Sequence, residues 1–205
     1  MIIHKILDNV FATWSNIAVL RVLDKVNIGL SGREIAKQSN MSAPSSLEAL
    51  SSLENLNIVT RQRGGREHFF SLNREHYIVK KIITQILNLE KKYAETIYSD
   101  IKKVLGKQSS SLIVFGSTAR IEEKVESDLD LCIIFKSAGE KSKIENTISE
   151  INLSLFKRYG VSLSPFFISE SEFKKRARNK KPPVPDIMRE GIVIYGKTIR
   201  KLLNE

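Results

Sequence analysis

At residues 111–120 the sequence reads SLIVFGSTAR, and at residues 126–135 it reads ESDLDLCIIF. The apolar run 112–115 predicts a buried strand, which a Gly-Ser pair ends before a short helix. The second stretch predicts another strand, and two carboxylates stand at its entrance. A strand, a turn, a helix and a second strand are therefore expected in close succession, and the rest of the chain is arranged around them.

The spacing of Asp128 and Asp130 has a chemical consequence. Side chains two positions apart on a strand point to the same face, so the two carboxylates project together with their Cα atoms about 7 Å apart. Mg²⁺ prefers one or two carboxylates together with waters and substrate phosphates. Gly116 lets a phosphate approach the backbone, while Ser117 and the N–H groups of the following helix start suit an anion. The pattern predicts a site for a metal and a phosphate.

The two segments resemble a known signature, Gly116-Ser117-x-x-Arg120 followed by Ser127-Asp128-x-Asp130-Leu131. It is that of the minimal nucleotidyltransferase domain of the DNA polymerase β superfamily, and the resemblance covers about residues 110–196. The resemblance implies that the two aspartates hold Mg²⁺ or Mn²⁺ and that the glycine and serine cradle the phosphates of an NTP. It gives Arg120 the role of stabilising charge or orienting the loop. The implied reaction transfers a nucleoside monophosphate to an acceptor, which the sequence does not identify, and releases pyrophosphate.

The sequence departs from the family pattern at two places. The family usually supplies a third carboxylate from a later strand, where this chain has Ser162 and Ser164. The glycine that often follows the motif arginine is Ile121 here. Two carboxylates support one metal readily and a second only weakly, so nucleotide–Mg²⁺ binding has more support than turnover. Asp186 and Glu190 are alternative sources of a base, although the sequence does not place them.

The N-terminal part has a different character. Residues 11–26 show helical apolar spacing, with Trp14 expected in the core. Ser31 and Glu34 form a capping box before a short helix. A second capped helix follows, and two short strands joined through a Gly-Gly turn predict a hairpin. This order resembles a winged helix-turn-helix over residues 10–73, on pattern more than on any signature residue.

The winged-helix resemblance implies duplex DNA as a partner, with the second helix in the major groove and the wing on the backbone. The early turns of that helix offer Ser45 and Ser46 to base edges. Arg61, Arg63 and Arg66 flank the wing turn and suit phosphates. The alternative is a winged helix that serves only protein contacts or dimerisation.

Residues 74–105 lack glycine and proline and predict one long helix, or two nearly continuous ones. An apolar stripe along this helix offers a surface for a homodimer, or else it packs against the chain's own domains. The predicted fold class is α+β. A winged helix-turn-helix domain occupies residues 1–73, a helical linker 74–109, and a small mixed-sheet nucleotidyltransferase-like domain 110–205.

Composition limits the function classes. The formal net charge of +10 over 205 residues favours polyanionic partners such as nucleic acid and nucleotides. A dense basic run at residues 174–181 is either a solvated helix end or a phosphate contact. No apolar run has the length of a membrane span, and the N-terminus lacks a convincing signal peptide. The single cysteine, Cys132, fits a buried position and a reducing cytoplasm.

Three functions follow from these patterns. The leading one is a nucleotidyltransferase with an attached DNA-binding domain. The second is a winged-helix transcriptional regulator whose transferase-like domain only binds nucleotide or is inactive, which the missing third acid favours. The third, which the nucleotidyltransferase resemblance also allows, is one component of a toxin–antitoxin pair that modifies a partner protein.

Overall fold

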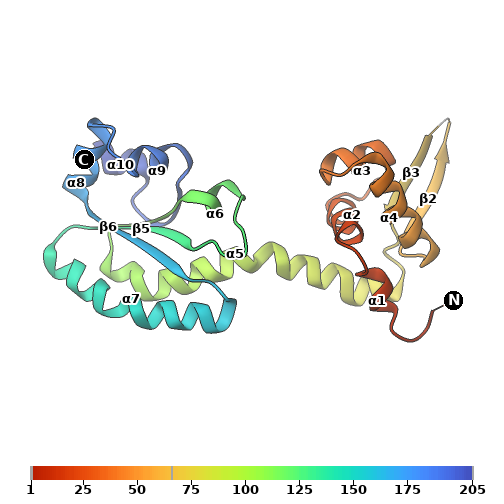
Figure 1. The fold of residues 1–205 in the computed structure, drawn as a ribbon, viewed down its shortest axis with the longest axis horizontal. Helices are drawn as coiled ribbons and strands as arrows, with labels where there is room; N and C mark the ends of the chain where they lie inside the picture. Colours follow the sequence, from red (N-terminus) through yellow and green to blue (C-terminus); the bar gives the residue numbers. More distant parts are fainter. Residues whose placement is uncertain (1, 66, 205) are drawn as a thin grey trace. The chain divides into compact units, whose positions relative to one another are not determined.

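The computed structural model describes residues 2–65 and 67–204. The chain divides into two compact units, Met1–Lys92 and Tyr93–Glu205 (Figure 1). No helix within the described ranges is both long enough and apolar enough to cross a membrane.

The N-terminal unit is built from short helices and one small sheet. Its elements are α1 (Ile6–Val10), α2 (Trp14–Asp24), β1 (Leu30–Ser31), α3 (Gly32–Gln38), α4 (Ala43–Asn55), β2 (Val59–Gly64) and β3 (Glu67–Leu72). The three strands form an antiparallel sheet in the order β1-β3-β2. The α3–α4 pair followed by the β2–β3 hairpin is the winged helix-turn-helix arrangement, so the predicted fold of this part is confirmed.

Capping side chains set the helix starts in this unit. The Ser31 hydroxyl accepts a hydrogen bond from the Glu34 N–H at 3.3 Å, and the Glu34 carboxylate accepts one from the Ser31 N–H at 2.8 Å. The predicted capping box is therefore present at the start of α3. At the start of α4, the Ser42 hydroxyl accepts from the Ser45 N–H at 3.3 Å.

The prediction of a buried Trp14 is wrong. Thr13 caps α2 by accepting a hydrogen bond from the Asn16 N–H at 3.2 Å, so the helix begins at Trp14 rather than at residue 11. Trp14 therefore lies on the first turn, where its side chain is 65% exposed. The core contribution of α2 comes from later residues such as Val19 and Leu23.

A long helical segment follows the wing. A π-helical turn, η1 (Val79–Ile83), leads directly into α5 (Thr84–Leu105), which ends in the 3₁₀ turn η2 (Gly106–Gln108). The predicted long helix is confirmed. Its apolar residues Ile86, Leu89 and Tyr93 are exposed. Dimerisation through this stripe stays a prediction.

A four-stranded mixed sheet is the centre of the C-terminal unit. The elements after η2 are β4 (Ser111–Val114), α6 (Gly116–Arg120), β5 (Leu129–Phe135), α7 (Ala138–Tyr159), β6 (Leu163–Ser169), α8 (Glu170–Arg178), α9 (Val184–Glu190), β7 (Ile192–Gly196) and α10 (Ile199–Asn204). The strand order is β6-β5-β4-β7. β5 and β6 are parallel, whereas β4 is antiparallel to both β5 and β7. The α+β fold class with its small mixed sheet is confirmed.

Successive residues of β5 face two different cores. Leu129, Leu131 and Ile133 pack with α5 and α7. Cys132 and Ile134 pack with residues of α8, α9 and α10 on the opposite side of the sheet (Figure 1). Cys132 is buried as expected, and burial raises the pKa of its thiol to about 12. The alternation places Asp130 on the same side as α8 and α9.

Candidate active site

Asp128 and Asp130 stand where β5 begins. Asp128 is exposed just before the strand, and Asp130, its second residue, is partly buried. Leu129 between them is 4% exposed and belongs to the core on the α5 side. The two carboxylates therefore lie on the side of the strand away from Leu129, at its open end, as the alternation predicts.

Gly116 lies directly against the Asp130 carboxylate. Its φ is +72°, and a Cβ placed on it would stand 2.2 Å from Asp130 Oδ2. The Phe115 N–H also donates to the Asp130 carbonyl at 3.1 Å. The backbone at the start of α6 can approach this carboxylate only because residue 116 has no side chain. Structure thus brings together Gly116 and Asp130, fourteen positions apart in the sequence.

The Asp128 and Asp130 carboxylates have no hydrogen-bond or ion-pair partner among the described residues. Most other acidic side chains of the C-terminal unit have one. These include Glu122, Glu170, Glu172, Asp186 and Glu190. Two oxygen ligands on one face suit Mg²⁺ or Mn²⁺, so the residues present fit a divalent cation.

A hydroxyl occupies the position beside Asp130 on the next strand. In the parallel pairing of β5 with β6, Asp130 is in register with Ser164. Ser162 contributes its carbonyl, which accepts the Leu129 N–H at 2.8 Å. Within residues 2–65 and 67–204, no group of three or more His, Cys, Asp or Glu side chains is placed to hold a metal ion. The aspartate pair is therefore not completed by a third acid in this fold.

Comparison with known proteins bears on this arrangement. Residues 95–184 match the family model of the nucleotidyltransferase domain. This range contains Gly116, Ser117, Arg120 and both aspartates. No curated protein matches the chain.

Two solved structures show weak overall similarity. One is NadR in complex with 4-hydroxyphenylacetate, at 23% identity and a TM-score of 0.35, covering 47% of this chain and 64% of that one. The other is ZitR of Lactococcus lactis, the C30AH42A mutant in apo form, at 14% identity and a TM-score of 0.34. The ZitR match covers 74% of this chain and 87% of that one.

Arg120, within the matched range, joins two helices. Its guanidinium donates to Glu122 at 2.8 Å and to Glu190 of α9 at 2.5 Å. These two hydrogen bonds, that of Glu122 first, raise the pKa of Arg120 above its ordinary value. Because Glu190 lies on α9, its ion pair with Arg120 ties α6 to α9. Asp186 and Glu190, the alternative bases, also pair with Arg189, at 2.8 Å and 3.4 Å.

A cavity on the other face of the sheet shares Leu129 with the start of β5. It has a volume of about 210 Å³ and is lined by Tyr93, Tyr98, Thr118, Ser127 and Leu129 among others. Burial, and secondarily the charge of Glu123, raises the pKa of Tyr98. Because Leu129 faces this cavity, the cavity is separated from the carboxylates by the strand itself.

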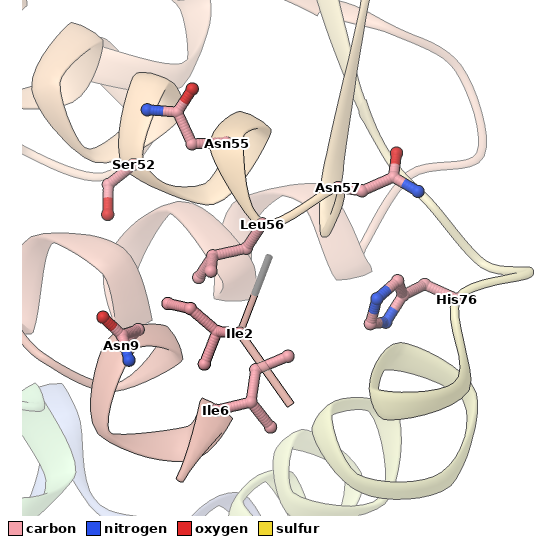
Figure 2. Close-up of a pocket in the computed structure, with 8 residues that line it drawn as sticks. All are labelled: Ile2, Ile6, Asn9, Ser52, Asn55, Leu56, Asn57 and His76. Carbon is pink, nitrogen blue, oxygen red and sulfur yellow. The ribbon is translucent and has the colours of Figure 1, made fainter. Parts of the chain in front are cut away.

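A larger hollow in the N-terminal unit is lined by no Asp, Glu, Lys or Arg side chain among the residues that the structure describes. Figure 2 shows eight side chains around it, contributed by the N-terminal segment, α1, the end of α4 and the residues after β3. Its volume is about 480 Å³, and its polar groups are asparagine amides, Ser52 and His76. His76 Nδ1 accepts the Ile78 N–H at 3.2 Å, which is a structural role. This lining does not suit a metal or a triphosphate.

The residues predicted to contact DNA differ in how exposed they are and in whether they already have a partner within the chain. Ser45 is partly exposed and its hydroxyl shares a 2.8 Å hydrogen bond with that of Ser42. Ser46 is fully buried, with 0% exposure, so its prediction as a base contact is corrected. Arg61 pairs with Glu54 at 3.0 Å, whereas Arg63 is exposed on β2. Arg66 lies outside the described residues.

Proposed function

We propose that this chain transfers a nucleoside monophosphate from an NTP to an acceptor in the presence of Mg²⁺ or Mn²⁺, releasing pyrophosphate. The observation that carries the proposal is the unpaired Asp128–Asp130 pair against the side-chain-free backbone of Gly116. The match of residues 95–184 to the nucleotidyltransferase domain supports the same reaction class.

The chain's own residues have separate tasks in this proposal. Asp128 and Asp130 hold the cation, which when bound neutralises phosphate charge and polarises the phosphoryl oxygens. Gly116 leaves room for a phosphate, and the Ser117 hydroxyl is available to donate to it. Arg120 acts through position, since its ion pairs with Glu122 and Glu190 hold α6 in place. Orientation and electrostatic stabilisation then account for the catalysis.

The residue beside Asp130 on the neighbouring strand is Ser164 rather than an acid, and this affects the expected rate of transfer. Without an acid beside Asp130, no carboxylate is in register to deprotonate an acceptor hydroxyl. General-base assistance is worth about 10²–10⁴-fold, so transfer to small alcohols is expected to be slow. A protein acceptor, including the partner in a toxin–antitoxin pair, remains within this proposal, because such a partner can supply the missing group.

The experiment uses NTPs labelled at the α-phosphate, with Mg²⁺ and with or without candidate acceptors. Wild-type protein is expected to label an acceptor, and Asp128→Asn and Asp130→Asn to abolish labelling without unfolding the chain. Glu126→Gln is the matched control, because Glu126 is an exposed neighbour on the same loop and is expected to retain activity. Labelling that survives both aspartate substitutions would refute the assignment.

A second candidate function is favoured by the winged-helix topology together with the absence of a third acid. In it, the N-terminal unit binds duplex DNA and the nucleotidyltransferase domain only senses nucleotide. Binding of Mg²⁺–ATP without any pyrophosphate release would distinguish this function from the first.

DNA binding itself is tested by its salt dependence. Arg63→Ala is expected to reduce the slope of log K against log salt by about 0.9, the value for one lost phosphate contact on duplex DNA. Lys81→Ala, on the helical segment after the wing, is the control and is expected to leave the slope unchanged. If the full-length chain does not bind duplex DNA at low salt, DNA binding is refuted and the winged helix serves protein contacts instead.

A further inference from the structure

Three strand ends of the C-terminal unit enclose a second cavity of about 400 Å³. Because β4 runs antiparallel to β5 and β7, the start of β4 meets the ends of the other two at one edge of the sheet. The cavity is lined there by Ser109, Ser110, Lys136, Lys197, Thr198 and Lys201, together with Tyr195 and Gly196. Its volume is within the usual range for small-molecule sites, about 300–1,000 Å³.

Backbone contacts hold this corner in place. The Lys197 N–H donates to the Ser110 carbonyl at 3.0 Å, and the Ser110 N–H donates to the Ile134 carbonyl at 2.7 Å. Gly196, at φ +83°, passes so close that a Cβ on it would stand 2.0 Å from the Ser110 carbonyl oxygen. The cavity wall is therefore tied to the sheet rather than to mobile loops.

The lining is cationic. Three lysines contribute to it, and none of the lining residues in the described part of the chain is acidic. Lys197 is partly neutralised by Glu170 at 3.3 Å. Lys136 and Lys201 are exposed. The Glu170 carboxylate pairs with Lys197 but does not line the cavity, so the lining carries net positive charge, which favours an anion.

The Ser110 hydroxyl is not part of the surface that a ligand would meet. Its hydroxyl oxygen is buried and has no hydrogen-bond partner among the described residues. A buried hydroxyl without a partner costs free energy, so such groups are usually satisfied by a ligand, an ion or a water. Because this oxygen is itself inaccessible to solvent, it does not face the open cavity, and a ligand there meets the lysine side chains instead.

We propose that this cavity binds phosphate groups, either of a single-stranded nucleic acid or of a free polyphosphate, through Lys136 and Lys201. The site is separate from the aspartate pair. Asp128 and Lys136 flank β5 eight positions apart, which corresponds to about 26 Å at 3.3 Å per residue. A ligand in the cavity is therefore not the triphosphate held at Asp128 and Asp130, and the proposal does not depend on nucleotidyl transfer.

Lysine footprinting on the full chain tests the location of binding. The protein is acetylated with and without inorganic tripolyphosphate or a twelve-residue oligothymidylate, and modification of each lysine is measured by mass spectrometry. Lys136 and Lys201 are expected to be protected at least threefold. Lys157 is the control, since it is exposed on α7 and does not line the cavity. Unchanged reactivity of Lys136 and Lys201 with both probes, or equal protection of Lys157, would overturn the proposal.

The two sources of phosphate are separated by the two probes. Protection by the oligonucleotide alone assigns the cavity to a nucleic acid strand, and protection by tripolyphosphate alone assigns it to a free polyphosphate. The double variant Lys136→Ala/Lys201→Ala is expected to weaken binding of the protecting probe about tenfold or more. For the oligonucleotide it should also reduce the salt slope by about 1.4, from 0.7 per single-strand phosphate contact. Lys157→Ala serves as the matched substitution, and wild-type affinity in the double variant would contradict the assignment.

Discussion

Gly116→Ala is the substitution that tests the candidate active site most directly. An alanine Cβ at this position would stand 2.2 Å from Asp130 Oδ2 and 3.1 Å from its Cγ. Cβ atoms do not approach other heavy atoms so closely, so either the Asp130 carboxylate must turn away or the start of α6 must move. The positive φ of +72° adds a backbone cost that is independent of Asp130.

Gly160→Ala separates the two costs. Gly160 has a φ of +68°, but nothing lies within 4 Å of a Cβ placed there. Both alanines incur the left-handed backbone cost of about 1–2 kcal/mol. At about 2–4 °C per kcal/mol for a chain of this length, each variant should lose about 2–8 °C of melting temperature. Any additional loss in Gly116→Ala measures its collision with Asp130.

Metal affinity provides the sharper measurement. Since Gly116→Ala displaces a cation ligand, Mn²⁺ affinity should fall about 10–100-fold, as it does when a supporting contact of a metal ligand is lost. Gly160→Ala should bind Mn²⁺ as the wild type does. Titrations followed by the electron paramagnetic resonance of free Mn²⁺, with melting curves in chelator, give both quantities. Equal Mn²⁺ affinity in all three proteins would show that Gly116 and Asp130 do not share a cation site.

Three further substitutions have defined outcomes. Ile121→Gly should stabilise the chain by about 0.5–1 kcal/mol in denaturant titrations, because Ile121 is exposed at φ +58° and relief of that conformation exceeds the entropic cost of glycine. Ser164→Asp should lower the melting temperature in chelator through repulsion with Asp130, and with Mg²⁺ it should regain stability and accelerate any basal transfer. The hydrogen bond from Tyr159, together with Lys103 and Arg158, holds the pKa of Asp100 below its usual 3.8, so its stabilisation is present above that pH and is lost as pH falls. The melting-temperature difference between wild type and Asp100→Asn should accordingly shrink below about pH 3.8.

The helices and strands follow from local patterns, but the side of a helix that is buried does not always follow from hydrophobicity. In α4 the leucine spacing places Leu47 in the apolar stripe, yet Leu47 is 52% exposed while Ser46 and Ala49 are buried. α4 packs against both α2 and α3, and small side chains allow that close approach. Leu50 and Leu53 are buried as their spacing predicts, so the departure is confined to the start of α4, where Ser46 rather than Leu47 faces the core.

Contacts between distant residues could not be predicted from spacing. The pairing of Arg120 with Glu190 joins residues seventy positions apart and depends on how α9 returns to α6. The lysine cavity likewise requires the ends of β5 and β7 to meet the start of β4. By contrast, the common face of the two aspartates needed only the two-residue period of a strand, and Ser164 needed only the neighbouring strand in parallel register.

The unpaired carboxylates also connect the cation site with stability. Two like charges that share a face repel each other, and a cation relieves that repulsion only in the folded chain. A ligand that binds only the folded state stabilises it by about 2.7 kcal/mol at one hundred times its dissociation constant. Mg²⁺ should therefore raise the melting temperature of the wild type, and less so that of Asp128→Asn or Asp130→Asn. This readout requires no turnover. A chain that Mg²⁺ stabilises but that releases no pyrophosphate from an NTP binds the cation without turnover, which favours the regulator, whereas pyrophosphate release favours the transferase.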